Sequence, residues 1–294
     1  MSPPLIILGC GYIGARLARA ALAAGRTVRV CARSTGRLAP LAEAGAQIKY
    51  LDAAMVKQLG PAMVSLNGAT VVYSIPPVGS LPPGHAMRAA VQAAAGSHIA
   101  CFIHFSSSGL YGADPDDETW VDEDTEVVSD PPMAGVLTDE AALDGSTFDQ
   151  VRTVILRLAP VYGPGRGVRT RLRAGTYKMV DDGAHMISRV HVDDVVNTVF
   201  CAEERATSGS RYLVADDEPT TQLTYATWLC DRMGLPLPPS RAILEPGKAK
   251  VAYRNRRIRN ARMKAELGVT LRYPTFREGE AAIEVEEAAA GETS

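Results

Sequence analysis

The stretch Gly9-Cys10-Gly11-Tyr12-Ile13-Gly14 decides how the first part of this chain folds. An apolar run, residues 5–8, precedes it, and an alanine-rich run with helical character, residues 15–24, follows it. A strand, a tight glycine turn and a helix N-terminus in this order are typical of a site for a dinucleotide pyrophosphate. The first turn of such a helix offers unpaired N–H groups and a positive dipole end to the anion. We therefore expect a dinucleotide to be held by Gly9, Gly11, Tyr12, Ile13 and Gly14.

Strand-like and helix-like segments alternate through the first half of the chain. The further strands that we expect are residues 27–31, 47–51, 70–75, 99–105 and 151–158. The helices that we expect between them are residues 36–44, 55–66 and 86–97. Buried apolar strands separated by helices indicate a parallel sheet that is covered on both faces. The predicted fold class is α/β, a doubly wound parallel sheet of the Rossmann type with a smaller, interleaved C-terminal cap.

The second half of the chain is less regular and supplies this cap. Pro and Gly cluster at residues 160–167 and 235–239, and shorter helices are expected at residues 221–233, 260–267 and 276–287. A helix at residues 190–204 is expected to return to the sheet. We predict a dinucleotide-binding domain of residues 1–165 with the returning helix 190–205. The cap would then consist of residues 166–189 and 206–294.

The composition is that of an ordinary soluble globular protein, with 46% apolar residues, 22% charged residues and a net charge of −2. This charge balance does not indicate a nucleic-acid partner, and no apolar run approaches the length that spans a bilayer. The first residues show no leader-like pattern. Five scattered cysteines without a C-x-x-C pair indicate reduced thiols instead of disulfides or zinc ligands. We expect a cytoplasmic protein with no nucleic-acid, membrane or metal partner.

The end of the second strand indicates which dinucleotide is preferred. NAD-binding proteins usually place Asp or Glu there, where it hydrogen-bonds the ribose 2′-hydroxyl. Here residues 30–35 read V-C-A-R-S-T and contain no carboxylate. Arg33, with Arg37 nearby, is suited to grip the 2′-phosphate of NADP, with a solvated loop arginine as the alternative. Asp52, after the third strand, is placed to accept from the adenine amino group or simply to form a turn.

Four further segments carry a resemblance to a known family. They are Ser106-Ser107-Ser108-Gly109-Leu110-Tyr111-Gly112, Leu156-Arg157-Leu158-Ala159-Pro160-Val161-Tyr162-Gly163-Pro164-Gly165-Arg166, Arg189-Val190-His191-Val192-Asp193-Asp194-Val195 and Tyr273-Pro274-Thr275-Phe276-Arg277-Glu278-Gly279. With the glycine turn, they resemble the short-chain dehydrogenase/reductase superfamily, in its extended or atypical branch, which is similar to the nucleoside-diphosphate-sugar epimerases. The segments keep the family's order and span nearly the whole chain. The resemblance implies that the segment around Pro160 runs under the nicotinamide, so that Pro160 joins the cofactor-binding residues.

The chain departs from this family at its acid–base pair. The family uses Tyr and Lys at Y-x-x-x-K spacing on one helix face, and the resemblance places Ala134 and Thr138 at these positions. None of the ten tyrosines has lysine four residues later. A positioned acid–base group contributes about 10²–10⁴-fold in rate, so that ordinary reductase chemistry needs a substitute. Ser107 aligns with the family's catalytic hydroxyl and Tyr111 lies in the same loop, although a backbone-satisfying serine and a packed tyrosine are the plainer interpretations.

Two charged stretches remain. Residues 114–126 hold eight carboxylates and no Lys or Arg, and residues 248–264 hold eight basic residues. Asp122 or Glu123 is a candidate acid–base group, with a solvated acidic loop as the alternative. The resemblance implies that basic residues of the cap meet a substrate diphosphate.

Three hypotheses of function follow. The first is an NADP-dependent oxidoreductase or epimerase/dehydratase-like enzyme on a small carbonyl or sugar-nucleotide-like substrate, with a substitute for the missing pair. The second is a cofactor-binding regulator or structural partner without redox turnover, and the third is a non-redox enzyme that reuses the cleft. The intact glycine turn argues against simple loss of cofactor binding. The resemblance also implies a homodimer through the helices near residues 86–97 and 132–144.

Overall fold

A seven-stranded parallel sheet forms the centre of the molecule, in the order β12-β7-β5-β4-β1-β2-β3. The computed structural model describes residues 2–112, 120–128, 133–144, 151–242 and 255–291. The strands are β1 (Leu5–Leu8), β2 (Val28–Ala32), β3 (Gln47–Tyr50), β4 (Thr70–Tyr73), β5 (Cys101–Ser107), β7 (Arg152–Leu158) and β12 (Ser210–Val214). All neighbouring pairs run parallel. The predicted α/β doubly wound sheet is therefore confirmed.

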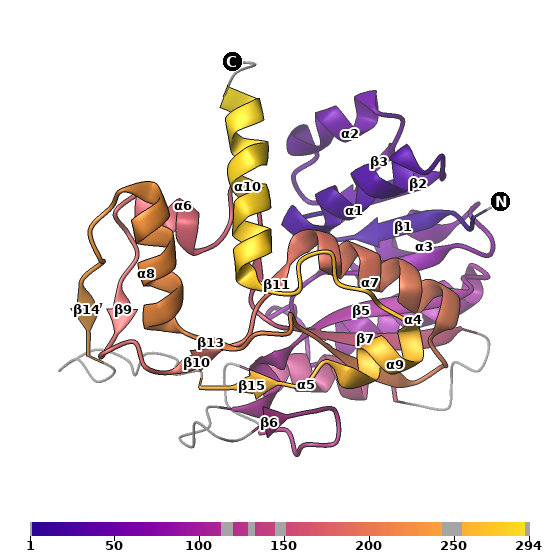
Figure 1. Cartoon of the computed structure of the whole chain (residues 1–294). Helices are drawn as coiled ribbons and strands as arrows, with labels where there is room; N and C mark the ends of the chain where they lie inside the picture. The colour runs from indigo at the N-terminus through magenta and orange to yellow at the C-terminus, as the bar shows by residue number, and fades with distance from the viewer. Residues whose placement is uncertain (1, 113–119, 129–132, 145–150, 243–254, 292–294) are drawn as a thin grey trace.

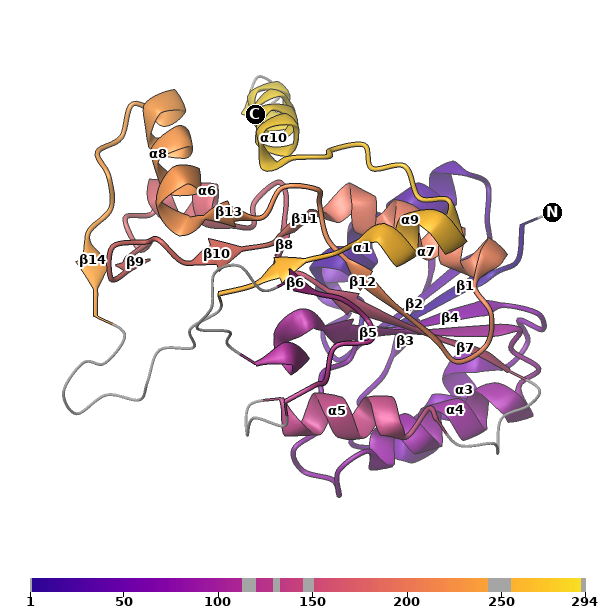
Figure 2. The ribbon, with the colours of Figure 1, turned by 60° about the horizontal axis from the view of Figure 1, so that its bottom comes forward.

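Helices cover both faces of the sheet, as Figure 2 shows. One face carries α1 (Tyr12–Ala23), α7 (Val192–Arg205) and α9 (Ala261–Leu267), and the other carries α3 (Leu59–Met63), α4 (His85–Gly96) and α5 (Ala134–Ala141). The apolar strand β1 serves both layers because successive side chains of a strand point to opposite faces. Leu5 and Ile7 join the apolar core that contains α1, whereas Ile6 and Leu8 join the core that contains α3 and α4.

Two expected helices are shorter than the sequence indicated. Residues 36–44 fold as a 3₁₀ turn, η1 (Gly36–Leu38), followed by α2 (Ala39–Glu43). Residues 55–66 fold as η2 (Val56–Gln58) followed by α3, which ends at Met63. Pro61 lies in the first turn of α3, where a missing backbone N–H costs little. The chain leaves the helix at Ser65, whose φ of 67° is incompatible with a continued right-handed helix.

A separate group of elements lies to one side of the sheet in Figure 1. It contains α6 (Val168–Arg173), β9 (Met179–Val180), β10 (Met186–Ile187), β13 (Thr220–Thr221), α8 (Gln222–Met233), β14 (Ser240–Arg241) and α10 (Phe276–Gly291). Four of these elements, α6, β9, α8 and α10, contribute to an apolar cluster of their own, which includes Tyr225, Leu229 and Phe276. The domain boundary at residue 165 stays a prediction.

The chain passes between these two groups more than once. Short strands β8 (Val161–Tyr162) and β11 (Val190–His191) pair in parallel where the first cap segment leaves the sheet and returns to it. A second short pair, β6 (Trp120–Val121) with β15 (Arg257–Ile258), brings a late segment against an early one. A last 3₁₀ turn, η3 (Ser108–Tyr111), follows β5. The edge strand β12 therefore belongs to the central sheet although it follows the first cap segment in the sequence.

Candidate functional site

The glycine turn between β1 and α1 has the conformation that the sequence indicated. Gly9 has a φ of +87°, and a Cβ atom there would lie 2.7 Å from Cγ1 of Ile75. A Cβ on Gly14 would lie 3.0 Å from Cγ2 of Ile7, so that this glycine sets the close approach of α1 to the strand. Gly9 and Gly14 are thus required by the protein's own packing.

Gly11 is different, because a Cβ atom at this position would not clash with any protein atom. Its φ of −95° is open to other residues, and a Cβ there would meet only the carbonyl oxygen of Gly9 at 4.0 Å. Gly11 stands at the N-cap of α1, no side chain caps this helix, and no acidic residue lies in its first turn. The exposed helix start is therefore a place where backbone N–H groups can meet an anion.

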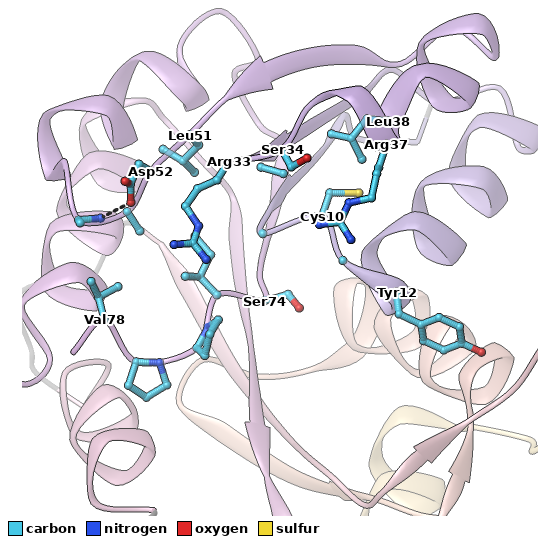
Figure 3. Close-up of a pocket in the computed structure, with 18 of the residues that line it drawn as sticks. Cys10, Tyr12, Arg33, Ser34, Arg37, Leu38, Leu51, Asp52, Ser74 and Val78 are labelled. Carbon is cyan, nitrogen blue, oxygen red and sulfur yellow. Dashed lines mark hydrogen bonds between the residues drawn. The ribbon is translucent and has the colours of Figure 1, made fainter. Parts of the chain in front are cut away.

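A cleft of about 1160 Å³ opens over this helix start. Its wall contains the glycine turn, the end of β2 with Arg33 and Arg37, the segment after β3 with Asp52, and the loop of residues 74–80 after β4. Figure 3 shows Arg33 and Arg37 at separate points of the cleft, with Arg37 beside Cys10 and, in this view, nearer to Tyr12 than Arg33 is. Ligands of open α/β sheets bind at such an edge, outside the carboxyl ends of the strands.

The described residues that line the cleft carry more positive than negative charge. Both arginines are exposed. Asp52 is the sole carboxylate among the described residues that line the cleft. One of its oxygens accepts from the backbone N–H of Ala54 at 3.1 Å, which is the turn arrangement that the sequence left as an alternative. The contact of Asp52 with the adenine amino group stays a prediction, for which its second carboxylate oxygen would serve.

The remaining predicted cofactor residues lie at different depths. Tyr12 lines the cleft, and the guanidinium of Arg166 stands 5.1 Å over its ring. Ile13 turns instead to the apolar core around α1, and Pro160 is exposed and lines neither this cleft nor the smaller cavity beside it. The structure therefore gathers Gly9, Gly11, Tyr12, Arg33 and Asp52 around one cleft and leaves Ile13 and Pro160 outside it.

A smaller cavity of about 200 Å³ adjoins the cleft, and the loop of residues 74–77 lines both. Its other walls are the end of β5, with Ser106 and Ser107, and one face of α5, with Val136 and Asp139. The Ser107 hydroxyl oxygen accepts from the backbone N–H of Gly109 at 3.0 Å. Ser107 thus lines the cavity and also satisfies the turn, and its catalytic role stays a prediction.

Tyr111 has a different environment from the one that its loop position suggested. It is buried, lines neither cavity, and its hydroxyl accepts from Nη1 of Arg157 at 2.6 Å. Burial raises the pKa of this phenol against the opposing effect of Arg157. The structure therefore places Tyr111 in a buried polar cluster and not beside Ser107.

Helix α5 presents a different face from the one that the resemblance implied. Ala134 and Thr138 line neither cavity, and the Thr138 hydroxyl donates to the Ala134 carbonyl at 2.8 Å. Val136 and Asp139, three residues apart and hence on one face, line the smaller cavity. The two positions at which the resemblance places the tyrosine and the lysine therefore lie on a face of α5 that does not line the smaller cavity.

The residue after Asp139 forms the centre of the buried polar cluster. Glu140 accepts from Nη2 of Arg157 at 2.7 Å and from its Nε at 3.0 Å, and it also accepts from the Ser106 hydroxyl. Glu140 and Arg157 are both buried. The sequence reasoning missed Asp139, Glu140 and their neighbour His104; two adjacent carboxylates inside the apolar helix of residues 134–143 were the signal.

The segment Arg189–Val195 has a structural role. His191 caps α7 by accepting from the backbone N–H of Asp193 at 3.2 Å. Asp193 points outward and pairs with Arg16 of α1 at 2.6 Å, whereas Asp194 points inward and accepts from the backbone N–H of Arg272 at 2.6 Å. The two aspartates therefore lie on different faces and join α7 to two other segments.

The two charged stretches contact each other where the structure describes them. Arg262 forms an ion pair with Asp124 at 2.5 Å, and Glu123 accepts from the backbone N–H of Leu213 at 2.8 Å. Asp122 accepts from the N–H of Thr125 within its own turn. Neither Asp122 nor Glu123 lines a cavity. Residues 114, 116–118, 248, 250 and 254 lie outside the described residues.

The fold and the cleft have the architecture of the Rossmann-type dinucleotide-binding proteins. The model of the NAD dependent epimerase/dehydratase family matches residues 5–215, and the chain belongs to this family. The expected membership in the extended short-chain dehydrogenase/reductase branch is confirmed.

Curated relatives are more distant. The chain is 27% identical over 194 residues to Protein YeeZ of Escherichia coli strain K12, which is 64% of each chain. It is 29% identical over 163 residues to a 3-diazoavenalumate denitrifying reductase of a Streptomyces species, which is 52% of each chain. The chain thus spans less than two-thirds of the length of these relatives.

Solved structures match almost end to end. A functionally unknown conserved protein from Silicibacter pomeroyi superimposes with a TM-score of 0.80 at 26% identity, over 97% of this chain and 99% of that one. DesIV, a dTDP-glucose 4,6-dehydratase from Streptomyces venezuelae with NAD and TYD bound, matches with a TM-score of 0.80 at 18% identity, over 98% of each chain. This second match shows a shared fold.

Two further findings concern the described ranges. No helix within them is long and apolar enough to cross a membrane. The same residues contain no group of three or more His, Cys, Asp or Glu side chains that could hold a metal ion.

Proposed function

We propose that this chain is an NADP(H)-dependent enzyme of the oxidoreductase or epimerase/dehydratase type that acts on a small unsaturated substrate, such as a carbonyl compound. The observation that carries the proposal is the cleft, in which an uncapped helix start and two arginines face the same space. The helix start suits a pyrophosphate, and the arginines suit one further phosphate. Gly9, Gly11, Tyr12, Arg33, Arg37 and Asp52 would hold the cofactor.

The preference for NADP rests on the arrangement at the end of β2. Arg33 and Arg37 line the cleft there, and β2 contains no carboxylate that could hydrogen-bond a ribose hydroxyl. A planar guanidinium binds phosphate through paired N–H groups, which favours the 2′-phosphate over a 2′-hydroxyl. Solved structures of the same fold with NAD bound, such as DesIV, support a nicotinamide cofactor but differ from this chain at more than four-fifths of their residues.

The bound cofactor would supply or accept hydride, and the protein's own groups would orient the substrate. Ser107 lines the smaller cavity next to the cleft and can direct its hydroxyl to a substrate oxygen. The similarity to the reductase of Streptomyces, over about half of the chain, supports a reductive reaction. A cytoplasmic location and a dimer through α4 and α5, which lie on the same face of the sheet in Figure 2, belong to this proposal.

A direct test is to titrate the purified chain with NADPH and with NADH, following the nicotinamide fluorescence. We expect NADPH to bind at least tenfold more tightly than NADH, because each phosphate–arginine pair adds a charge-assisted contact worth about 1.5–3 kcal/mol. Equal affinities would overturn the preference for NADP. Failure of both nucleotides to bind would overturn the enzyme proposal and favour a partner-binding role for the Rossmann fold.

A further inference from the structure

The cavity beside the cleft contains a buried carboxyl group without a partner. Asp139 is 3% exposed and lines this cavity from α5, next to the loop of residues 74–77 that also walls the cleft. None of the described residues forms a hydrogen bond or an ion pair with its carboxyl group. Its neighbour Glu140 has three such contacts, from Arg157 and Ser106. Asp139 is thus the acidic group of α5 that the protein leaves available to the cavity.

A second unpartnered polar side chain faces the same space. His104 of β5 lines the cavity, is 3% exposed, and has no hydrogen-bond partner at either ring nitrogen within the described part of the chain. The hydroxyl of Tyr73, whose ring lies 5.8 Å from the imidazole, also has none. Buried polar groups in proteins are nearly always satisfied, so that exceptions gathered around one cavity indicate a place for a ligand or water.

The charged state of Asp139 follows from these surroundings. Burial raises the pKa of its carboxyl group to about 6, and Arg88 of α4 opposes this rise from a distance. Burial also lowers the pKa of His104 to about 4, so that the imidazole is neutral at the pH at which Asp139 titrates. Tyr73 stays protonated because burial raises its pKa. Glu140 is paired with Arg157, and the raised pKa of Asp139 brings its own change of charge toward neutral pH.

We propose that Asp139 is the proton-exchanging residue of this site and faces the nicotinamide end of the dinucleotide. The inference rests on the proposed function. When a hydride, which carries an electron pair, adds to the carbon atom of a substrate C=O bond, Asp139 would give its proton to the oxygen atom. The C=O bond would thereby become H–C–O–H, with the hydride supplied by the bound reduced dinucleotide, which would be oxidised, and water would return a proton to the carboxylate of Asp139.

This arrangement predicts a difference between the two redox forms of the cofactor. An ionised Asp139 attracts the cationic ring of NADP⁺ and not the neutral ring of NADPH. The affinity for NADP⁺ relative to NADPH should therefore rise as the pH increases through about 6, by about tenfold. The titration of the 2′-phosphate cancels in this ratio because both nucleotides carry it.

The experiment compares wild type, Asp139→Asn and Asp144→Asn at pH 5.0, 6.0, 7.0 and 8.0, with the dissociation constants of both nucleotides from calorimetry. Asn has the shape of the protonated carboxyl, and Asp144 is a matched control because it lies just beyond α5, half-exposed and paired with Arg211. We expect the ratio to rise with pH in wild type and Asp144→Asn, and to stay flat in Asp139→Asn. Runs in two buffers of different ionisation enthalpy should show that wild type releases more protons on binding NADP⁺ than on binding NADPH near pH 6.

Each other outcome has a definite meaning. A flat ratio in wild type, or the same rise in wild type and Asp139→Asn, overturns the role of Asp139 while the binding itself upholds the proposed function. Failure of both nucleotides to bind overturns the proposed function instead. If Asp139→Asn does not fold, the proton release of wild type decides, and equal release with both nucleotides excludes Asp139.

Discussion

Arg157 of β7 and Glu140 of α5 form a buried two-point ion pair, with Nη2 2.7 Å from Oε2 and Nε 3.0 Å from Oε1. The same guanidinium donates to Tyr111, and the same carboxylate accepts from Ser106. The pair therefore joins α5 to the two adjacent strands β5 and β7 and to the turn after β5. It also fixes the direction of α5, and with it the face on which Asp139 lies.

Glu140→Gln should lower the free energy of unfolding by about 3 kcal/mol, because removing one partner leaves a buried guanidinium without its counter-charge. Urea denaturation at pH 7 measures the change. Asp124→Asn is the control, since Asp124 is 78% exposed in its pair with Arg262, and a surface pair contributes less than about 1 kcal/mol. Equal effects of the two substitutions would contradict the structural importance of the buried pair.

Gly11→Val should fold normally and lose dinucleotide binding by more than a hundredfold. The φ of Gly11 is negative and no protein atom crowds a Cβ there, so that the new side chain would fill the volume meant for the pyrophosphate. Calorimetry with NADPH measures the affinity, and a thermal melt checks the fold. A valine variant that binds as tightly as wild type would place the pyrophosphate elsewhere.

Arg33→Ala should weaken NADPH by about tenfold or more and leave NADH nearly unchanged, since only NADPH carries the 2′-phosphate. Lys57→Ala removes one positive charge from an exposed position outside the cleft and serves as the control. Fluorescence titration of all three proteins gives the comparison. An equal loss of affinity for NADPH and NADH would mean that Arg33 contributes only to the overall electrostatic potential of the cleft.

Asp139→Asn should make the protein more stable at pH 7.5 by about 2 kcal/mol, with the gain shrinking to nearly zero toward pH 4. The sign follows from the raised pKa of about 6 in the folded state against a model value of 3.8. The folded protein holds this proton more tightly than the unfolded chain, so that the cost of ionising Asp139 accumulates between about pH 3.8 and about pH 6 and stays constant above that. Urea denaturation at pH 7.5, 6.0 and 4.5 tests this, and a gain that does not change with pH would contradict it.

The sequence predicted the parts of the fold that depend on local pattern. The glycine turn, the parallel strands and the returning helix follow from apolar runs and their spacing, and the observed bounds differ from those expected by one or two residues at most strands. The helix expected at residues 55–66 was wrong in length, because only five residues between Gln58 and Val64 stay in the α conformation. Such shortening depends on packing and turn geometry that no local pattern contains.

The candidate site was predictable only in its cofactor half. Arg33 and Gly11 are recognised by their distance from a strand, which the sequence shows directly. Asp139 and His104 are 35 residues apart, and they meet because β5 and α5 pack together, which is a tertiary relationship. Tyr111 was interpreted from its loop alone, and its contact with Arg157 could not be foreseen because β7 begins 41 residues later.

The late arrival of β12 limits how this protein can be divided. Residues 210–214 complete the edge of the sheet beside β7, yet they follow the first cap segment in the chain. A gene fragment that ends at residue 165 would encode β7 without its neighbour, and an uncovered parallel edge strand is a template for association between chains. Swapping caps between relatives to exchange substrate preference therefore requires three simultaneous exchanges, at residues 163–189, between β12 and α9, and at α10, instead of one fusion point.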